Sequence, residues 1–180
     1  YWNETKLRRF LDRIDGRQIV VLDEPYCEFV EAADFPNGMK LLGEYPNLLG
    51  FRTFSKMFAL AGLRIGFMAG AEKLIDVVRR TCVVYSVNSF AQQAAIGSLE
   101  DAAQHIDETR AMVRQARAFL GCELDKLGLF HLAGEANYMM IRLPMSDTLA
   151  YRKLMTQGLM VRSMTGFRFP NHIRVTLGTL

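Results

Sequence analysis

The chain contains Gln18-Ile-Val-Val-Leu-Asp23-Glu-Pro-Tyr26, in which an aliphatic run is followed by two acids and a proline. A continuous aliphatic run is typical of a strand buried on both faces of a parallel sheet. Pro25 ends the strand because proline cannot donate to the hydrogen-bond ladder. Asp23 then lies at the carboxyl end of the strand, where open α/β sheets bind their ligands. The stretch favours an α/β fold with a site near Asp23.

Two other interpretations fit the same stretch. Asp23 could cap a helix that has Pro25 in its first turn, which would make this a plain strand-to-helix connection. A hydrophobic strand followed by Asp-Glu-Pro also resembles the Walker B motif of transporter-type ATPases. Those ATPases carry a Ser-Gly-Gly-Gln signature shortly before that strand, and residues 1–17 lack it. A Gly-x-x-x-x-Gly-Lys-Ser/Thr phosphate loop is absent as well, but that absence alone is weak evidence. The missing signature, together with the lysine segment described next, disfavours the ATPase interpretation.

A second segment groups hydroxyls and an arginine around one lysine; it reads Thr53-Phe-Ser-Lys56-Met-Phe-Ala-Leu-Ala-Gly-Leu-Arg64. A lysine whose amine is partly neutral forms a Schiff base with an aldehyde. Hydroxyls and a guanidinium are suited to surround a phosphate. Lys56, with Ser55 and Arg64 nearby, therefore predicts a site for an aldehyde that carries a phosphate, as pyridoxal phosphate does. The alternative is an ordinary solvated loop lysine.

The glycines at positions 62, 66 and 70 also imitate the small-residue stripe of a membrane-helix dimer. That interpretation is excluded because the apolar run is too short to span a bilayer and contains Arg64.

The motifs together resemble the fold-type I, class I and II pyridoxal phosphate-dependent aminotransferases, and most closely the histidinol-phosphate aminotransferase branch. The resemblance extends over essentially the whole chain and preserves the order of the motifs. It is carried by Asp23-Glu-Pro-Tyr-Cys-Glu-Phe29, Tyr45-Pro-Asn-Leu48, Arg52-Thr-Phe-Ser-Lys56, Leu60-Ala-Gly-Leu-Arg-Ile-Gly66, Tyr85-Ser-Val-Asn-Ser-Phe-Ala-Gln92, Ala136-Asn-Tyr138 and Ile173-Arg-Val-Thr-Leu-Gly-Thr179.

The resemblance implies a role for each residue of the cofactor site. Lys56 matches the lysine that holds pyridoxal phosphate covalently and moves a proton during the reaction. Asp23 matches the carboxylate that keeps the pyridine nitrogen protonated, so that the ring can accept electrons. Tyr26 matches the phenol that hydrogen-bonds the 3′ oxygen of the cofactor. The phosphate ligands implied are Thr53, Ser55 and Arg64.

The resemblance also implies substrate-binding residues. Arg174 matches the arginine that grips the substrate α-carboxylate in a bidentate pair. Its alternative is an ordinary arginine on a late strand. Arg162 matches, after a one-residue gap, an arginine that helps hold the substrate phosphate in the histidinol-phosphate branch. Three positions depart from the common family pattern, namely Pro25, Cys27 and Ala59, and they weaken the assignment to a particular branch.

The resemblance implies amino-group exchange between histidinol phosphate and 2-oxoglutarate. It also implies three partners, namely this amino compound, a 2-oxo acid and a second copy of the chain in a homodimer. Two alternatives remain open. One is a pyridoxal phosphate-dependent decarboxylase of the threonine-phosphate type. The other is an aminotransferase-like effector domain of a transcription regulator, which would be preceded by a DNA-binding domain.

The implied fold class is α/β. Residues 1–100 are expected to form the C-terminal portion of the large cofactor-binding domain, with a mostly parallel sheet and flanking helices. Residues 101–180 are expected to form a linking helix and a small α+β domain. The periodicity predicts helices over 3–13, 71–80, 89–99, 102–127 and 146–157, and strands near 18–22, 48–53, 64–69, 138–143, 159–162 and 172–177. Gly128 is placed to end the long helix, and Ser146 to cap the next one.

Composition adds several expectations. Members of the resembled family are about twice as long as these 180 residues, so the chain is expected to be a C-terminal half that is inactive alone. The net charge is +3 without a basic tract, which gives no reason to expect nucleic-acid binding. Three cysteines without paired spacing predict reduced thiols and no metal site in a cytoplasmic protein. No membrane segment is visible.

Overall fold

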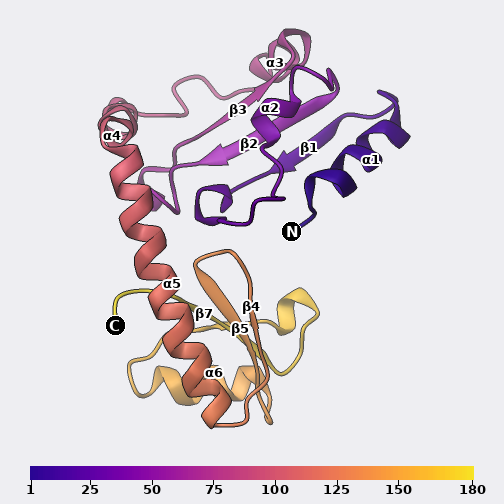
Figure 1. Ribbon diagram of the computed structural model, residues 1–180. Helices are drawn as coiled ribbons and strands as arrows, with labels where there is room; N and C mark the ends of the chain where they lie inside the picture. Colours follow the sequence, from indigo (N-terminus) through magenta and orange to yellow (C-terminus); the bar gives the residue numbers. More distant parts are fainter. The chain divides into compact units, whose positions relative to one another are not determined.

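The computed structural model describes residues 1–180, which fall into two compact units, Tyr1–Ile106 and Asp107–Leu180. Each unit has its own sheet (Figure 1). The longest helix, α5 (Ala102–Lys126), begins in the first unit and continues into the second. None of the helices combines the length and the apolar character needed to cross a membrane. Nowhere do three or more His, Cys, Asp or Glu side chains lie together as metal ligands would.

The first unit contains a three-stranded sheet with the order β1-β2-β3. Its strands are β1 (Val20–Asp23), β2 (Leu48–Thr53) and β3 (Gly66–Gly70). Its helices are α1 (Glu4–Ile14), the single turn α2 (Gly38–Leu41), α3 (Glu72–Arg79) and α4 (Ser89–Glu100). Short 3₁₀ turns at Cys27–Phe29 and Ala61–Leu63 complete it.

Strands β1 and β2 run parallel, with Asp23 opposite Phe51. Strand β3 runs antiparallel to β2, with Gly66 opposite Thr53. The α/β fold class is confirmed, and the apolar runs in the sequence did not distinguish the direction of β3. Because parallel strands end at the same edge, the carboxyl ends of β1 and β2 lie side by side.

The core of the first unit lies on one face of this sheet. Leu7 and Leu11 of α1 pack against Leu41 and Leu48, and all four side chains are at most 4% exposed. Asn3 caps α1 by accepting a hydrogen bond from the Lys6 N–H, and Asp15 ends the helix in the left-handed conformation. Helix α1 therefore presents its leucines to the sheet.

The other face of β1 is open, which corrects the prediction of a strand buried on both faces. Val21 is 51% exposed, whereas its neighbours Val20 and Leu22 are half-buried against the core. Further along the open face, Phe51 is also exposed. The aliphatic run identified the strand correctly, but it overstated how much of the strand is covered within these residues.

The second unit contains an antiparallel sheet with the order β4-β5-β7-β6. The strands are β4 (His131–Ala133), β5 (Tyr138–Arg142), β6 (Arg162–Ser163) and β7 (His172–Thr176). Helix α6 (Asp147–Met155) connects β5 to β6, and a 3₁₀ turn at Thr165–Phe167 lies between β6 and β7. Met139, Ile141 and Ile173 form its buried face and are at most 5% exposed.

Most predicted elements of the second unit agree with the structure. Gly128 has a φ of +65° just after α5, as expected for a glycine that ends a helix. Ser146 occupies the N-cap of α6, but its side chain makes no capping hydrogen bond. The strand expected near 159–162 is short and begins only at Arg162, and β4 was not predicted. A strand of three residues carries too little periodicity to be recognised from sequence.

A buried carboxylate holds the β6–β7 connection in place. Asp147, at the start of α6, is 1% exposed and has no cationic partner. It accepts hydrogen bonds from the Ser163 and Thr165 hydroxyls at 2.5 and 2.6 Å. The backbone N–H groups of Met164, Thr165 and Asn171 also donate to it, at 2.9, 2.9 and 3.0 Å. Burial alone would raise the pKa of Asp147, but these donors more than offset it and hold the pKa well below its usual range.

We expect Asp147→Asn to lower the free energy of unfolding at pH 7 by about 2 kcal/mol. The side-chain NH₂ of Asn is a donor, and it would replace one carboxylate oxygen that accepts these hydrogen bonds. A carboxyl with a lowered folded-state pKa stabilises the fold above its unfolded pKa of about 3.9 and loses that contribution as the pH falls further. Urea denaturation followed by circular dichroism should therefore show the difference between the two proteins shrinking below about pH 4. The matched control is Asp125→Asn, whose exposed carboxylate lies at the end of α5. If the difference in unfolding free energy did not shrink at low pH, the lowered pKa of Asp147 would be contradicted.

Candidate functional site

The residues singled out in the first unit gather at the carboxyl edge of β1 and β2. Asp23 is the last residue of β1 and Thr53 the last residue of β2. Ser55 and Lys56 follow Thr53 directly, and Tyr26 follows Asp23 within the turn after β1. Parallel pairing of the two strands is what brings the two sequence motifs to one edge.

The segment between β2 and β3 is a closed loop that presents Lys56. The Phe54 N–H donates to the Ile65 carbonyl at 3.2 Å and closes the loop at its base. The Leu60 N–H donates to the Phe54 carbonyl at 3.0 Å and folds the loop back onto itself. The Ala59 N–H donates to the carbonyl of Lys56 at 3.1 Å. The backbone on both sides of the lysine is therefore fixed by hydrogen bonds.

Two non-glycine residues of this loop adopt the left-handed conformation. Ala59 has a φ of +56° and Arg64 a φ of +53°. This conformation costs a residue with a Cβ atom about 1–2 kcal/mol. At Gly66 the strands approach so closely that a Cβ atom would lie 2.6 Å from the carbonyl oxygen of Arg52. The preference of the resembled family for glycine at the position of Ala59 has a physical reason in this backbone geometry.

The hydroxyls of Thr53 and Ser55 lie together. Thr53 Oγ1 donates to Ser55 Oγ at 2.9 Å, and the Ser55 N–H donates to Thr53 Oγ1 at 3.1 Å. Arg64 lies two residues before Gly66, and Gly66 is the residue that pairs with Thr53 across the strands. The Arg64 side chain is exposed and spends one N–H on the Ala61 carbonyl at 2.8 Å. The remaining N–H groups of this guanidinium and the Ser55 hydroxyl are left as donors of the kind that suit a phosphate.

Lys56, Tyr26 and Asp23 supply the remaining chemistry at this edge. The Lys56 ammonium lies 5.8 Å from the centre of the Tyr26 ring. Lys56 is exposed and makes no ion pair. Asp23 is exposed as well, and its carboxylate has no cationic partner within the chain. An amine, a phenol, an unpaired carboxylate and a phosphate-type donor group are the functional groups that pyridoxal phosphate requires, so the residues present fit that cofactor.

The sequence interpretation missed the buried ion pair behind this edge. Glu24 is 5% exposed and accepts hydrogen bonds from Arg52 Nη2 at 3.1 Å and from the Gly38 N–H at 3.1 Å. Gly38 has no room for a side chain, since a Cβ atom would lie 2.7 Å from Glu24 Oε1. The signal was present in the strand pairing, because the Glu24 N–H bonds to Phe51 O and so places Glu24 beside Arg52. Burial raises the pKa of Glu24, and Arg52 opposes that rise.

Arg162 and Arg174 lie in the second unit, where they are opposite each other on β6 and β7. Both line an open groove of about 480 Å³ together with Tyr151, Met160, Val161, Ser163 and Thr176. The Arg174 guanidinium lies over the Tyr138 ring at 4.8 Å, and that of Arg162 over the Phe167 ring at 5.1 Å. Neither arginine has an acidic partner. Two arginines on aromatic rings and without carboxylates form a site suited to an anion.

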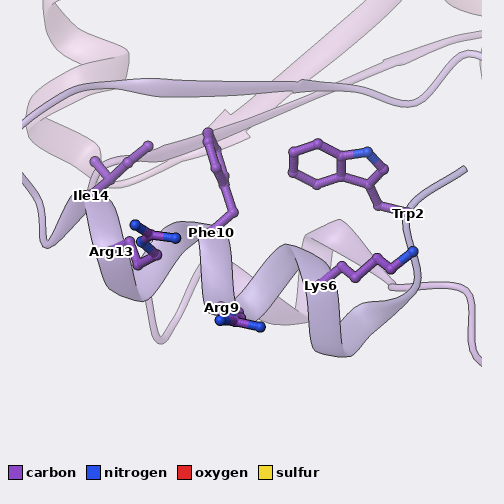
Figure 2. Close-up of a pocket in the computed structure, with 6 residues that line it drawn as sticks. All are labelled: Trp2, Lys6, Arg9, Phe10, Arg13 and Ile14. Atoms are coloured by element: carbon purple, nitrogen blue, oxygen red, sulfur yellow. The ribbon is translucent and has the colours of Figure 1, made fainter.

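A second groove runs along the outer side of α1 (Figure 2). Trp2 and Phe10 pack edge-to-face there at 5.3 Å, and Ile14 points to the same side. The cationic side chains of Lys6, Arg9 and Arg13 complete the lining. None of the residues that the sequence assigned to the cofactor or substrate lies in this groove.

Comparison with known proteins identifies the family. The sequence profile described as "Aminotransferase class I and II" matches residues 1–180. The chain belongs to this aminotransferase family. The histidinol-phosphate aminotransferase of Geobacillus thermodenitrificans is 39% identical over 184 aligned residues, which cover 99% of this chain and 49% of the relative. This class I and II aminotransferase chain thus spans about half the length of the curated relatives it matches.

Solved aminotransferases share the fold. The histidinol-phosphate aminotransferase of Clostridium acetobutylicum superimposes with a TM-score of 0.88 at 22% identity, over 98% of this chain and 55% of that one. The histidinol-phosphate aminotransferase of Sinorhizobium meliloti, solved in complex with pyridoxal-5′-phosphate, gives a TM-score of 0.84 at 24% identity, over 98% of this chain and 49% of that one. Both confirm the predicted architecture of an aminotransferase fold.

We expect Arg52→Leu to lower the free energy of unfolding by about 3 kcal/mol at neutral pH, because it leaves Glu24 buried without its cation. The pKa of Glu24 is already raised, so protonation favours the folded state. The cost of the substitution should therefore shrink as the pH is lowered toward that pKa. Chemical denaturation between pH 5 and pH 8 measures the effect, with the exposed Arg79→Leu of α3 as the control. If the drop in unfolding free energy did not change with pH, the loss of the cation beside Glu24 would not be its cause.

Proposed function

We propose that the protein containing this chain is a pyridoxal phosphate-dependent aminotransferase acting on histidinol phosphate and 2-oxoglutarate. One observation carries the proposal, namely the meeting of Lys56, Tyr26 and Asp23 with the Thr53–Ser55 hydroxyls at one sheet edge. The full-length histidinol-phosphate aminotransferases that match nearly the whole chain support the choice of substrate.

When bound, pyridoxal phosphate supplies an electron sink for the negative charge that develops at the substrate α-carbon. Lys56 would hold the cofactor through its Nζ atom, and the same amine would take the proton from the substrate α-carbon. The closed loop around Lys56 orients the amine for both tasks. Tyr26, whose ring lies 5.8 Å from that amine, would donate a hydrogen bond from its hydroxyl to the 3′ oxygen of the cofactor.

Asp23 holds a proton on the cofactor's ring nitrogen by pairing with it as an anion. Its carboxylate has no cationic partner in the chain, and the nearby Arg52 donates to Glu24 on the other face of the sheet. The Thr53 and Ser55 hydroxyls, the Arg64 guanidinium and adjacent N–H groups bind the cofactor phosphate. Together these residues would hold the cofactor at its phosphate, its ring nitrogen and its 3′ oxygen, next to Lys56.

The arginine pair of the second unit binds the anionic end of the substrate. Arg174 grips a carboxylate in the 2-oxo acid, and Arg162 joins it on the phosphate of the amino compound. Their aromatic partners, Tyr138 and Phe167, keep the guanidinium planes oriented without neutralising them. One arginine pair then serves both half-reactions.

In this proposal residues 1–100 form part of the large cofactor-binding domain, and residues 101–180 form the linking helix and the small domain. The chain acts as a homodimer in the cytoplasm. Exposed apolar side chains support a partner surface near the start of α4: Val83, Val84 and Tyr85 lie in the segment before the helix, and Phe90 lies in its first turn.

Borohydride reduction of the full-length protein with bound pyridoxal phosphate should place the pyridoxyl group on Lys56. Lys56→Ala should lose this label and lower turnover by at least about 10²–10⁴-fold, the range expected for a positioned proton carrier. Peptide mapping by mass spectrometry and a half-reaction with histidinol phosphate measure the two effects. Lys73→Ala, an exposed lysine on α3, is the matched control. Label on another lysine would refute the assignment.

Asp23→Asn should leave the cofactor bound through its phosphate and Lys56, yet lower the rate of the half-reaction by about 10²–10³-fold. The reason is that an amide cannot hold the proton on the ring nitrogen as an anion does. Cofactor absorbance and single-turnover kinetics separate binding from rate. Asp76→Asn on α3 serves as the control. Near-normal turnover of the Asp23 variant would show that this strand end has another role.

A further inference from the structure

We propose that Asp147 is a positioning residue that aligns Arg162 and Arg174 for an anionic substrate. The inference deepens the proposed function and rests on it for the identity of the anion. Asp147 touches neither arginine, so it acts through the backbone that carries them. The anion it serves is of the phosphate or carboxylate class.

Asp147 connects to the strand of Arg162 on one side of the β6–β7 connection. Ser163, the residue after Arg162, donates its hydroxyl to Asp147 Oδ2 at 2.5 Å. Thr165 donates both its N–H and its hydroxyl, at 2.9 and 2.6 Å. Thr165 begins the 3₁₀ turn that contains Phe167, and the Phe167 ring lies beneath the Arg162 guanidinium at 5.1 Å. The carboxylate therefore fixes both the backbone of Arg162 and the ring on which its side chain rests.

The same carboxylate connects to the strand of Arg174 on the other side. The Asn171 N–H donates to Asp147 Oδ1 at 3.0 Å, and Asn171 holds a left-handed φ of +62° immediately before β7. Arg174 lies in the middle of that strand, opposite Arg162. One carboxylate thus bridges both ends of the connection and sets how the two arginines face each other.

The restraint by Asp147 is needed because Arg162 and Arg174 repel each other. Like charges directly opposite each other on neighbouring strands are destabilising, and neither arginine has an acidic partner in the chain. Strand β6 has only two residues, so its ladder contributes little to holding the pair together. Asp147 supplies the missing restraint without neutralising either guanidinium. Both charges stay available for a ligand.

Capping of α6 does not account for Asp147. The N-cap of that helix is Ser146, and the hydrogen bonds of Asp147 go to residues 163–171 rather than to its own first turn. A residue serving only the helix would bond to its own N–H groups.

The test uses the full-length protein saturated with pyridoxal phosphate, with inorganic phosphate as the anion probe. Asp147→Asn is the main variant, and Thr165→Val, which removes one of the donors, is a milder one that keeps the fold. Asp125→Asn is the matched control. Calorimetry gives the dissociation constant for phosphate, and hydrogen exchange follows the Thr165 and Asn171 amides. Steady-state kinetics give KM and kcat for histidinol phosphate.

We expect Asp147→Asn to speed exchange at both amides, to weaken phosphate binding about tenfold, and to raise KM by a similar factor while kcat changes less than about threefold. Thr165→Val should show the same pattern at smaller size. In Asp147→Asn/Arg174→Ala, phosphate binding should be no weaker than in Arg174→Ala alone, because the two residues act on one site.

Unchanged phosphate affinity in Asp147→Asn would overturn the positioning role, whatever the activity. Additive losses in the double variant would overturn it too, since they would indicate general destabilisation. Phosphate binding that is indifferent to Arg174→Ala would overturn it by removing the anion site itself. If phosphate binding follows the expected pattern but no amino donor is turned over, the proposed function fails and the role of Asp147 stands.

Discussion

Parallel pairing of β1 with β2 is the constraint on which the candidate site depends. The two strands place an acid and a hydroxyl at the same end, with Asp23 beside Phe51 and Thr53 two residues further on. A shift of one residue in this register would turn Asp23 to the opposite face of the sheet. The leucine core on one face, with Leu48 completely buried, makes such a shift costly. The packing of α1 against the sheet therefore also fixes the geometry of the site.

Each unit uses one buried carboxylate for structure and leaves other charges exposed for chemistry. Glu24 binds Arg52 and the Gly38 N–H, while the adjacent Asp23 stays exposed and unpaired. In the second unit, Asp147 takes hydrogen bonds from the β6–β7 connection, and the two arginines keep their full charge. In each unit the buried ionic group is hydrogen-bonded within the fold, and the nearby groups without an ionic partner remain available for a ligand.

Sequence reasoning found those parts of the structure that local patterns encode. The strand before Asp23, the hydroxyl-lysine-arginine segment and the long helix ending at Gly128 each have a signature within a short window of residues. The direction of β3 escaped it, because an apolar run does not record which neighbour it will join. The Glu24–Arg52 pair and the bonds of Asp147 escaped it for a related reason. Each joins residues at least 16 positions apart that only the tertiary fold brings together.

The left-handed residues Ala59 and Arg64 have a consequence for binding. A loop closed by its own hydrogen bonds and held in a sparsely populated conformation has few other shapes available to it. The entropy of ordering the backbone around Lys56 is therefore lost during folding rather than when a ligand binds. Such preorganisation leaves more of the intrinsic contact energy to appear as affinity. The cost of this strained backbone is met during folding, so it does not reduce the affinity when a ligand binds.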